Sequence, residues 1–121
     1  MLLLPFGLMA QTATIAPSGN KIFTFAEQSP AYPGGETAMA KFVQENLKYT
    51  AEAKEANVHG LVIAQFVVDI DGKITETNVV KKLGYGLDEE AIRIINSFPK
   101  FKPALQDGKP IAFRYTLPIR F

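Results

Sequence analysis

The chain has 121 residues, a hydrophobic fraction of 47% and a formal net charge of +1. This length suits one domain with a single hydrophobic core. Lysine and arginine do not cluster along the chain, which argues against nucleic acid or an acidic membrane surface as the partner. Because there is no cysteine, disulfides, thiolate nucleophiles and zinc–thiolate sites are excluded.

The first ten residues are apolar throughout, and the chain turns polar at Gln11. Ten residues are too few to span a bilayer. They resemble the second half of a secretory signal with cleavage after Ala10, although the positively charged start of such a signal is missing. We interpret residues 1–10 as a signal-peptide remnant, which predicts export to the periplasm or the cell exterior. A buried N-terminal strand or helix is the alternative.

Residues 11–26 predict a linker, within which Lys21–Phe25 has the composition of a strand and is a candidate edge strand. A break rich in proline and glycine follows, and a helix is predicted from Glu36. Its apolar residues recur at helical spacing, at Met39, Phe42, Val43 and Leu47.

The middle of the chain predicts a short helix and a hairpin. Thr50 is a good cap for a helix over Ala51–Ala56. The near-continuous apolar run Leu61–Val68 predicts the central strand, because both of its faces are apolar. Asp71–Gly72 predicts a two-residue type I′ turn, and the more polar Lys73–Lys81 predicts the returning outer strand.

A further helix opens with three carboxylates at Asp88, Glu89 and Glu90, which suit the positive end of a helix. Pro99 ends it. Its apolar stripe consists of Leu87, Ala91, Ile94, Ile95 and Phe98.

Residues 111–121 alternate large apolar side chains at odd positions with small, polar or proline residues at even ones. This period of two predicts a strand with one face on the core. Pro118 lies inside it, and a proline without a backbone N–H is confined to edge strands, strand starts and bulges. An edge strand offers free N–H and C=O groups to an extended peptide, so this strand is the first candidate for a binding site.

The order of elements predicts an α+β fold, a two-layer sandwich with helices packed on one face of a three- to four-stranded antiparallel sheet. The central strand lies between its hairpin partner and the last strand. Whether Lys21–Phe25 covers the free edge of the last strand is left open. If the helices cover the other face, Val62, Ala64, Phe66 and Val68 form a half-covered second face of the sheet.

No group of residues has the spacing of a catalytic or metal site. His59 is the sole histidine, and a metal site needs several convergent ligands. Asp69 and Asp71 resemble the start of a calcium loop whose later ligands are absent. No serine lies in a nucleophile elbow. We predict no enzymatic activity, no metal site and no cofactor.

From about Glu27 to Phe121 the chain resembles the C-terminal domain of TonB proteins, in the form common in Bacteroidetes. The resemblance is carried by Glu27–Gly35, Gly60–Gly72, Leu87–Ala91, Phe98–Ala104, Gly108–Pro110 and Leu117–Phe121. It implies that residues 27–121 form a periplasmic binding module of the TonB energy-transduction system. Such a module captures the TonB box, a short segment of outer-membrane transporters, by adding it as a strand. Carried over to this chain, the peptide lines up on Phe113, Arg114, Tyr115, Thr116 and Leu117.

A full transducer of this family has a membrane-spanning helix and a long proline-rich spacer, and this sequence shows neither. We therefore expect a free-standing periplasmic protein, or one that works with an inner-membrane energising complex. The alternative function is self-association, in which the same edge strand, or the half-covered second face of the sheet, forms a homodimer of a structural or assembly protein of the cell envelope.

Overall fold

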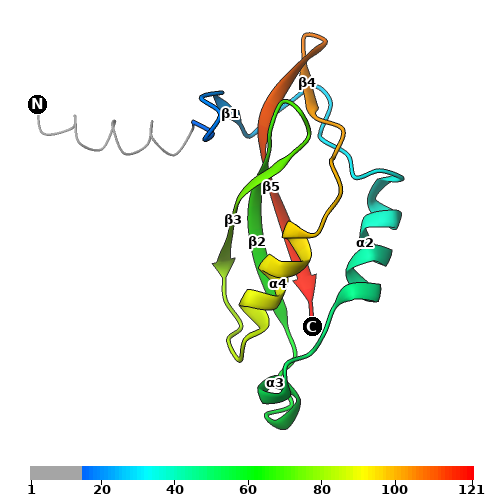
Figure 1. Ribbon diagram of the computed structural model, residues 1–121, viewed down its shortest axis with the longest axis vertical. Helices are drawn as coiled ribbons and strands as arrows, with labels where there is room; N and C mark the ends of the chain where they lie inside the picture. Colours follow the sequence, from blue (N-terminus) through cyan, green and yellow to red (C-terminus); the bar gives the residue numbers. More distant parts are fainter. Residues whose placement is uncertain (1–14) are drawn as a thin grey trace, which may run out of the picture.

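The computed structural model describes residues 15–121, so the predicted signal remnant at residues 1–10 and the first part of the predicted linker lie outside the described residues. Figure 1 shows a twisted sheet with helices beside and in front of it. The elements in chain order are β1 (Ile22–Phe23), α2 (Gly35–Asn46), α3 (Ala51–Glu55), β2 (Leu61–Val68), β3 (Ile74–Lys81), α4 (Leu87–Asn96), β4 (Ala104–Gln106) and β5 (Lys109–Arg120). Among the residues described, no helix combines the length and the apolar character that crossing a membrane requires.

The sheet is organised around β5. Its C-terminal part pairs antiparallel with β2, which pairs antiparallel with β3 on its other side. β1 also pairs with β5, but in parallel. The sheet is therefore mixed, and the prediction of a purely antiparallel sheet is wrong for β1. Parallel neighbours need a long crossover connection, and here everything from α2 to β4 lies between β1 and β5.

The two Asp-Gly pairs form different turns. Asp107–Gly108 has positive φ at both residues, 53° and 73°, and joins β4 directly to β5, as a type I′ turn requires. The predicted type I′ turn at Asp71–Gly72 is wrong, because only Gly72 has positive φ there and its N–H donates to the Asp69 carbonyl. A longer loop results, in which the Gly72 carbonyl accepts a hydrogen bond of 2.9 Å from the Phe101 N–H.

The main core lies between one face of the sheet and the helices. Fully buried side chains from β2 meet Met39 of α2, Ala53 of α3 and the apolar stripe of α4. The β2 side chains in this core are Val62, Ala64, Phe66 and Val68. The helices therefore cover this face, and the condition under which these four residues would form a half-covered second face is not met. Both faces of β2 are apolar, so its sequence could not tell which one the helices cover.

The second face of the sheet is partly covered by the N-terminal segment. Ala16 and Ile22 pack against Val67 of β2 and Ala112 of β5, and all four side chains are buried. The Asn20 side chain donates to the Asp69 carboxylate at 3.3 Å, which ties this segment to the loop after β2. Residues 15–23 therefore form a strap over one end of this face, and we call them the N-terminal strap.

Candidate functional site at the β5 margin

The pattern of hydrogen bonds between β5 and β2 determines which backbone groups of β5 point away from β2. Gly60 and Phe121 exchange two backbone hydrogen bonds, of 3.1 and 2.8 Å, and the register between the strands then continues without a shift. Hydrogen-bonded and non-hydrogen-bonded pairs alternate along an antiparallel ladder. The backbone groups of Thr116, Pro118 and Arg120 therefore point away from β2. Within residues 15–121 no strand pairs with them, and we call them the open β5 margin.

The position of Pro118 is compatible with this alternation of hydrogen-bonded and non-hydrogen-bonded pairs. Its missing N–H would point outward, so the ladder with β2 loses no hydrogen bond. Thr116, Pro118 and Arg120 are all exposed. The margin thus offers the N–H and C=O of Thr116, the C=O of Pro118, and the N–H and C=O of Arg120.

The opposite edge of the sheet, formed by β3, is irregular. Its register against β2 shifts twice, and Glu76 has a φ of 50°, in the left-handed region. Bulges and left-handed residues bend an edge and hinder the addition of another strand. Of β3 and β5, the strand with a regular and unpaired stretch of edge is therefore β5, beyond the two residues that β1 pairs with.

β1 lies beside the first of the five residues predicted to contact a peptide and, within residues 15–121, leaves the later ones without a neighbouring strand on that side. Phe113 pairs with Val68 of β2 on one side and with Phe23 of β1 on the other. Arg114 lies opposite Val67, on the face that the N-terminal strap partly covers. The first part of the predicted stretch is therefore beside the chain's own strand.

The other three residues lie beyond β1. Tyr115 stacks on Phe66 in the core, with ring centroids 5.1 Å apart. Thr116 is on the open margin, and its hydroxyl accepts a hydrogen bond of 3.2 Å from the Gln65 side chain. Leu117 faces α2 and lines a groove with it. The open margin continues to Arg120, three residues past the predicted stretch.

Two adjacent grooves run between α2 and β5. The lower groove, of about 200 Å³, is lined mainly by apolar side chains of α2 and by Leu117–Arg120. The upper groove, of about 380 Å³, lies between the start of α2 and the side chains of Phe113 and Tyr115. Met39 lines both grooves, so the two adjoin along β5, and we call them together the α2–β5 trough.

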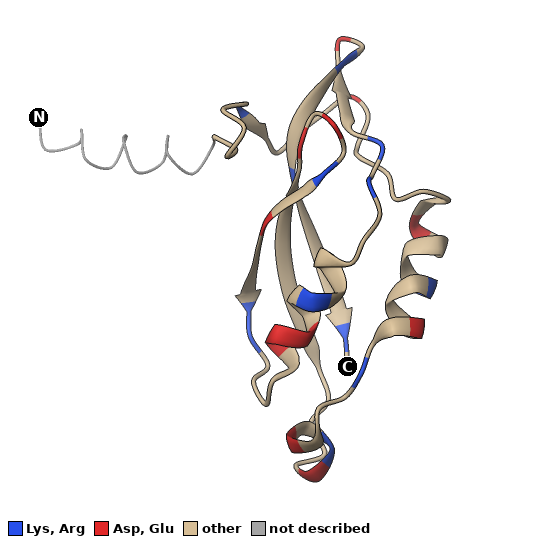
Figure 2. Ribbon diagram, in the orientation of Figure 1, with Lys and Arg blue, Asp and Glu red and all other residues tan. Residues whose placement is uncertain are grey.

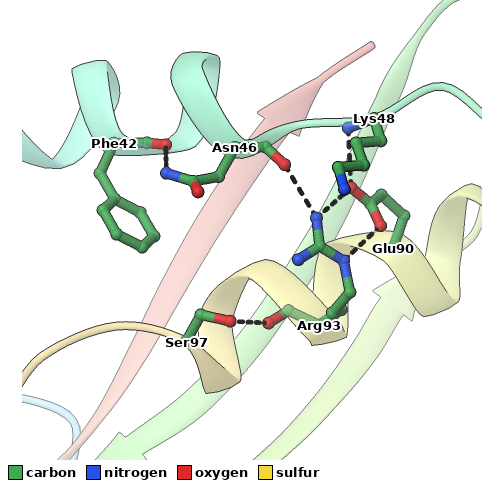
Figure 3. Close-up of polar contacts among 6 residues, drawn as sticks. All are labelled: Phe42, Asn46, Lys48, Glu90, Arg93 and Ser97. Carbon is green, nitrogen blue, oxygen red and sulfur yellow. Dashed lines mark hydrogen bonds and ion pairs between the residues drawn. The ribbon is translucent and has the colours of Figure 1, made fainter.

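The position of α2 is fixed at its C-terminal end by an ion pair on α4 (Figure 3). The Arg93 guanidinium donates to both oxygens of Glu90 at 2.7 Å and to the Asn46 carbonyl at 2.8 Å. Glu90 also accepts the Lys48 N–H at 2.7 Å. The hydrogen bond from Arg93 is the largest cause of a lowered Glu90 pKa, and the Lys48 N–H adds to it against the opposing effect of burial. We call this group the α2–α4 clamp.

The pKa of Tyr115 reflects the burial and the negative charge at the upper groove. Its pKa is raised above the ordinary value, first by burial and then by the negative charge of Glu36, which lies in the first turn of α2. A tyrosine with a raised pKa stays protonated at neutral pH, so its hydroxyl serves the groove as a neutral hydrogen-bonding group. Glu36 and Tyr115 therefore give the lining of the upper groove an acidic and a neutral polar side chain.

The remaining candidates for chemistry have structural roles. His59 is exposed and is bonded through Nδ1 to the Tyr49 hydroxyl at 3.0 Å and through Nε2 to Asn57 at 3.1 Å. The Asp88 carboxylate accepts the N–H groups of Leu83 and Gly84 and holds the turn before α4. Over residues 15–121 no three acidic, histidine or cysteine side chains converge as metal ligands.

The model of the Gram-negative bacterial TonB protein C-terminal family matches residues 45–121. The chain belongs to this family. Protein TonB of Vibrio cholerae is 31% identical over 75 residues, a match that covers 61% of this chain and 30% of that protein. The chain thus spans less than a third of this relative's length.

Two solved structures of the Helicobacter pylori TonB C-terminal domain share the fold. The one comprising its residues 194–285 has a TM-score of 0.52 at 21% identity and covers 70% of this chain and 89% of that one. The one comprising residues 179–285 has a TM-score of 0.53 at 20% identity, with coverages of 70% and 77%. These likenesses extend the family assignment to the arrangement of helices and sheet.

The TonB C-terminal family match begins inside α2, so β1 and most of the trough wall lie before it. The predicted domain start at residue 27 stays a prediction. Sequence reasoning missed the trough because Val43 and Leu47 have the spacing of core residues, and this spacing does not reveal how far each is covered. In the structure both are only half-buried. That incomplete burial is a tertiary signal with no counterpart in the sequence.

Proposed function

We propose that the chain is a periplasmic binding module of the TonB energy-transduction system. It captures TonB-box segments of outer-membrane transporters by strand addition and has no catalytic role. Membership of the TonB C-terminal family supports a role in the TonB system, and the open β5 margin supports binding by strand addition. An inner-membrane energising complex is the partner that would supply the force.

The proposed contact begins where β1 ends. Tyr115, Thr116 and Leu117 belong to it from the predicted stretch, and Pro118 to Arg120 extend it. Phe113 and Arg114 would join the contact only when β1 has left β5, since Phe113 already pairs with Phe23. The proposed site is thus the C-terminal half of β5.

The energetics favour a guest that uses both the backbone and the trough. Each added backbone hydrogen bond stabilises the complex by about 0.5–1.5 kcal/mol net, and ordering the guest costs a comparable amount per residue. The few groups of the open margin therefore give little net affinity alone. Apolar burial in the trough, at about 25 cal/mol per Å², must supply the rest.

The deciding test is the substitution Thr116→Pro. It removes an N–H that points to the guest and not to β2, so the protein should fold, as it does with Pro118. We expect binding of a transporter N-terminal peptide to be lost in fluorescence anisotropy, with an unchanged circular dichroism spectrum. Thr116→Val is the control, because it keeps the N–H and should bind within about twofold of wild type. A folded Thr116→Pro variant that binds normally would refute the proposed contact.

The same margin would pair with a second copy if the chain acted as a homodimeric assembly protein. Sedimentation at rising protein concentration separates the two functions. A protein that stays monomeric up to millimolar concentration while binding the peptide supports capture of a transporter segment. A dimer that Thr116→Pro dissociates would favour self-association instead.

A further inference from the structure

A strand added to the open β5 margin places its side chains alternately on the two faces of the sheet, as β5 itself does. Tyr115, Leu117 and Ile119 pack toward the main core beneath the helices. Thr116 and Arg120 therefore lie on the opposite face. Side chains of directly paired residues share a face, so every second guest side chain would enter the α2–β5 trough.

In the middle of the trough, part of the apolar surface of α2 is left uncovered. A helix packed on a core normally buries a continuous apolar stripe. In α2 only Met39 is buried, whereas Val43 is half-buried and Ala40 is exposed at the wall of the lower groove. Apolar side chains of a guest would complete this stripe.

The two ends of the site carry opposite charges, one in the trough and the other at the end of β5, on the opposite face of the sheet. Glu36 lines the upper groove and Arg120 lines the lower one, and Figure 2 shows the acidic first turn of α2 and the basic end of β5. Within residues 15–121 neither side chain has a hydrogen bond or an ion pair. A guest with a basic residue at one end and an acidic residue at the other is complementary to this arrangement.

We propose that the α2–β5 trough, together with Arg120 on the opposite face of the sheet, recognises an extended segment by its side chains. The segment has a basic residue beside Glu36, apolar residues at the next two alternate positions, and an acidic residue beside Arg120. Read along β5 from Tyr115 to Arg120, the hexapeptide Lys-Thr-Val-Thr-Val-Glu meets these requirements. The proposal rests on strand addition at the open β5 margin and specifies which guests that margin selects.

The test uses labelled peptides and the full chain at low ionic strength. The matched hexapeptide is compared with its charge-exchanged form, Glu-Thr-Val-Thr-Val-Lys, and each is also made in reverse order so that parallel and antiparallel guests are both sampled. We expect the better matched peptide to bind about two- to fivefold more tightly than its exchanged form, the range of exposed ion pairs. Equal affinity of matched and exchanged peptides in both orders would overturn the proposal.

Two sets of variants locate the effect. Glu36→Lys combined with Arg120→Glu should invert the preference, and an unchanged preference would count against the proposal. Ala40→Asp places a charge in the apolar part of the trough and should weaken binding about tenfold. Thr37→Asp adds the same charge to an exposed position of α2 outside the trough and should leave binding unchanged.

Thr116→Pro distinguishes a failure of strand addition from a failure of side-chain recognition. If it abolishes binding of every peptide while charge order and Ala40→Asp have no effect, strand addition stands and the side-chain recognition fails. If it leaves binding of the matched peptide intact, strand addition itself fails. Absence of binding by all four peptides to the wild-type chain would refute the recognition proposal.

Discussion

Gly72 shows how one residue connects the hairpin loop to the rest of the molecule. Its φ of 85° lies in the left-handed region, and a Cβ placed on it would be 2.1 Å from the Phe101 carbonyl oxygen. That oxygen belongs to the backbone, and the Phe101 N–H is itself bonded to the Gly72 carbonyl, so neither partner can move away easily. Only glycine fits this contact.

We predict that Gly72→Ala lowers the free energy of unfolding by about 3 kcal/mol or more, because backbone strain and a steric clash add. Gly108→Ala is the matched control: φ is 73° there, but a Cβ meets open space. It should lose only the strain, about 1 kcal/mol. Urea denaturation measures both, and equal losses would show that the contact with Phe101 carries no energy.

At the scale of elements, β1 and α2 define the two limits of the site. β1 occupies the edge of β5 at Ala112 and Phe113 and so sets where the open margin begins. α2, held by the α2–α4 clamp, forms the outer wall of the trough. β1 and most of α2 come from residues before the TonB C-terminal family match, so part of the site's surroundings lies outside the matched region.

We predict that Ile22→Asp detaches the N-terminal strap, since Ile22 is 4% exposed and anchors it on Val67. The Ala112 amide, whose N–H faces β1, should then exchange its hydrogen at least about tenfold faster, because its opening costs less. Ile15→Asp changes an exposed residue of the same strap and should have no such effect. Unaltered exchange at Ala112 in Ile22→Asp would mean that β1 does not depend on this packing.

At the scale of the whole molecule, two carboxylates join segments that are distant in sequence. Glu90 links α4 to the end of α2, and Asp69 links the hairpin loop to the N-terminal strap. Burial acts to raise the Asp69 pKa, but hydrogen bonds from Ser18, the Ile70 N–H and Asn20 together lower it below the ordinary value. Both carboxylates thus favour their charged forms in the folded protein.

A carboxylate with a lowered pKa contributes stability that is present above its unfolded pKa and is lost as pH falls through its folded pKa. We therefore predict that thermal stability declines as pH falls below about 4, where unfolded Asp and Glu titrate. Asp69→Asn and Glu90→Gln should each be less stable than wild type at pH 7, by about 1 kcal/mol, and should decline less in acid. Melting curves from pH 7 to pH 2 test this, and variants with the wild-type acid dependence would contradict it.

Local periodicity in the sequence predicted most of the helices and strands of this protein, whereas β5 has an unpaired margin only beyond its pairing with β1. The alternation at residues 111–121 and the proline at 118 predict an edge strand, and the stripe of α4 predicts a helix on the core, because these patterns depend only on side chains close in sequence. The tertiary structure alone decided which face of β2 the helices cover, since Val62 and Val67 are equally apolar. It also decided that β1 pairs in parallel, that Gly72 closes against Phe101, and that α2 leaves a trough beside β5. Those features depend on backbone pairing and packing between distant segments, and backbone hydrogen bonds carry no residue-specific signal that a single sequence could reveal.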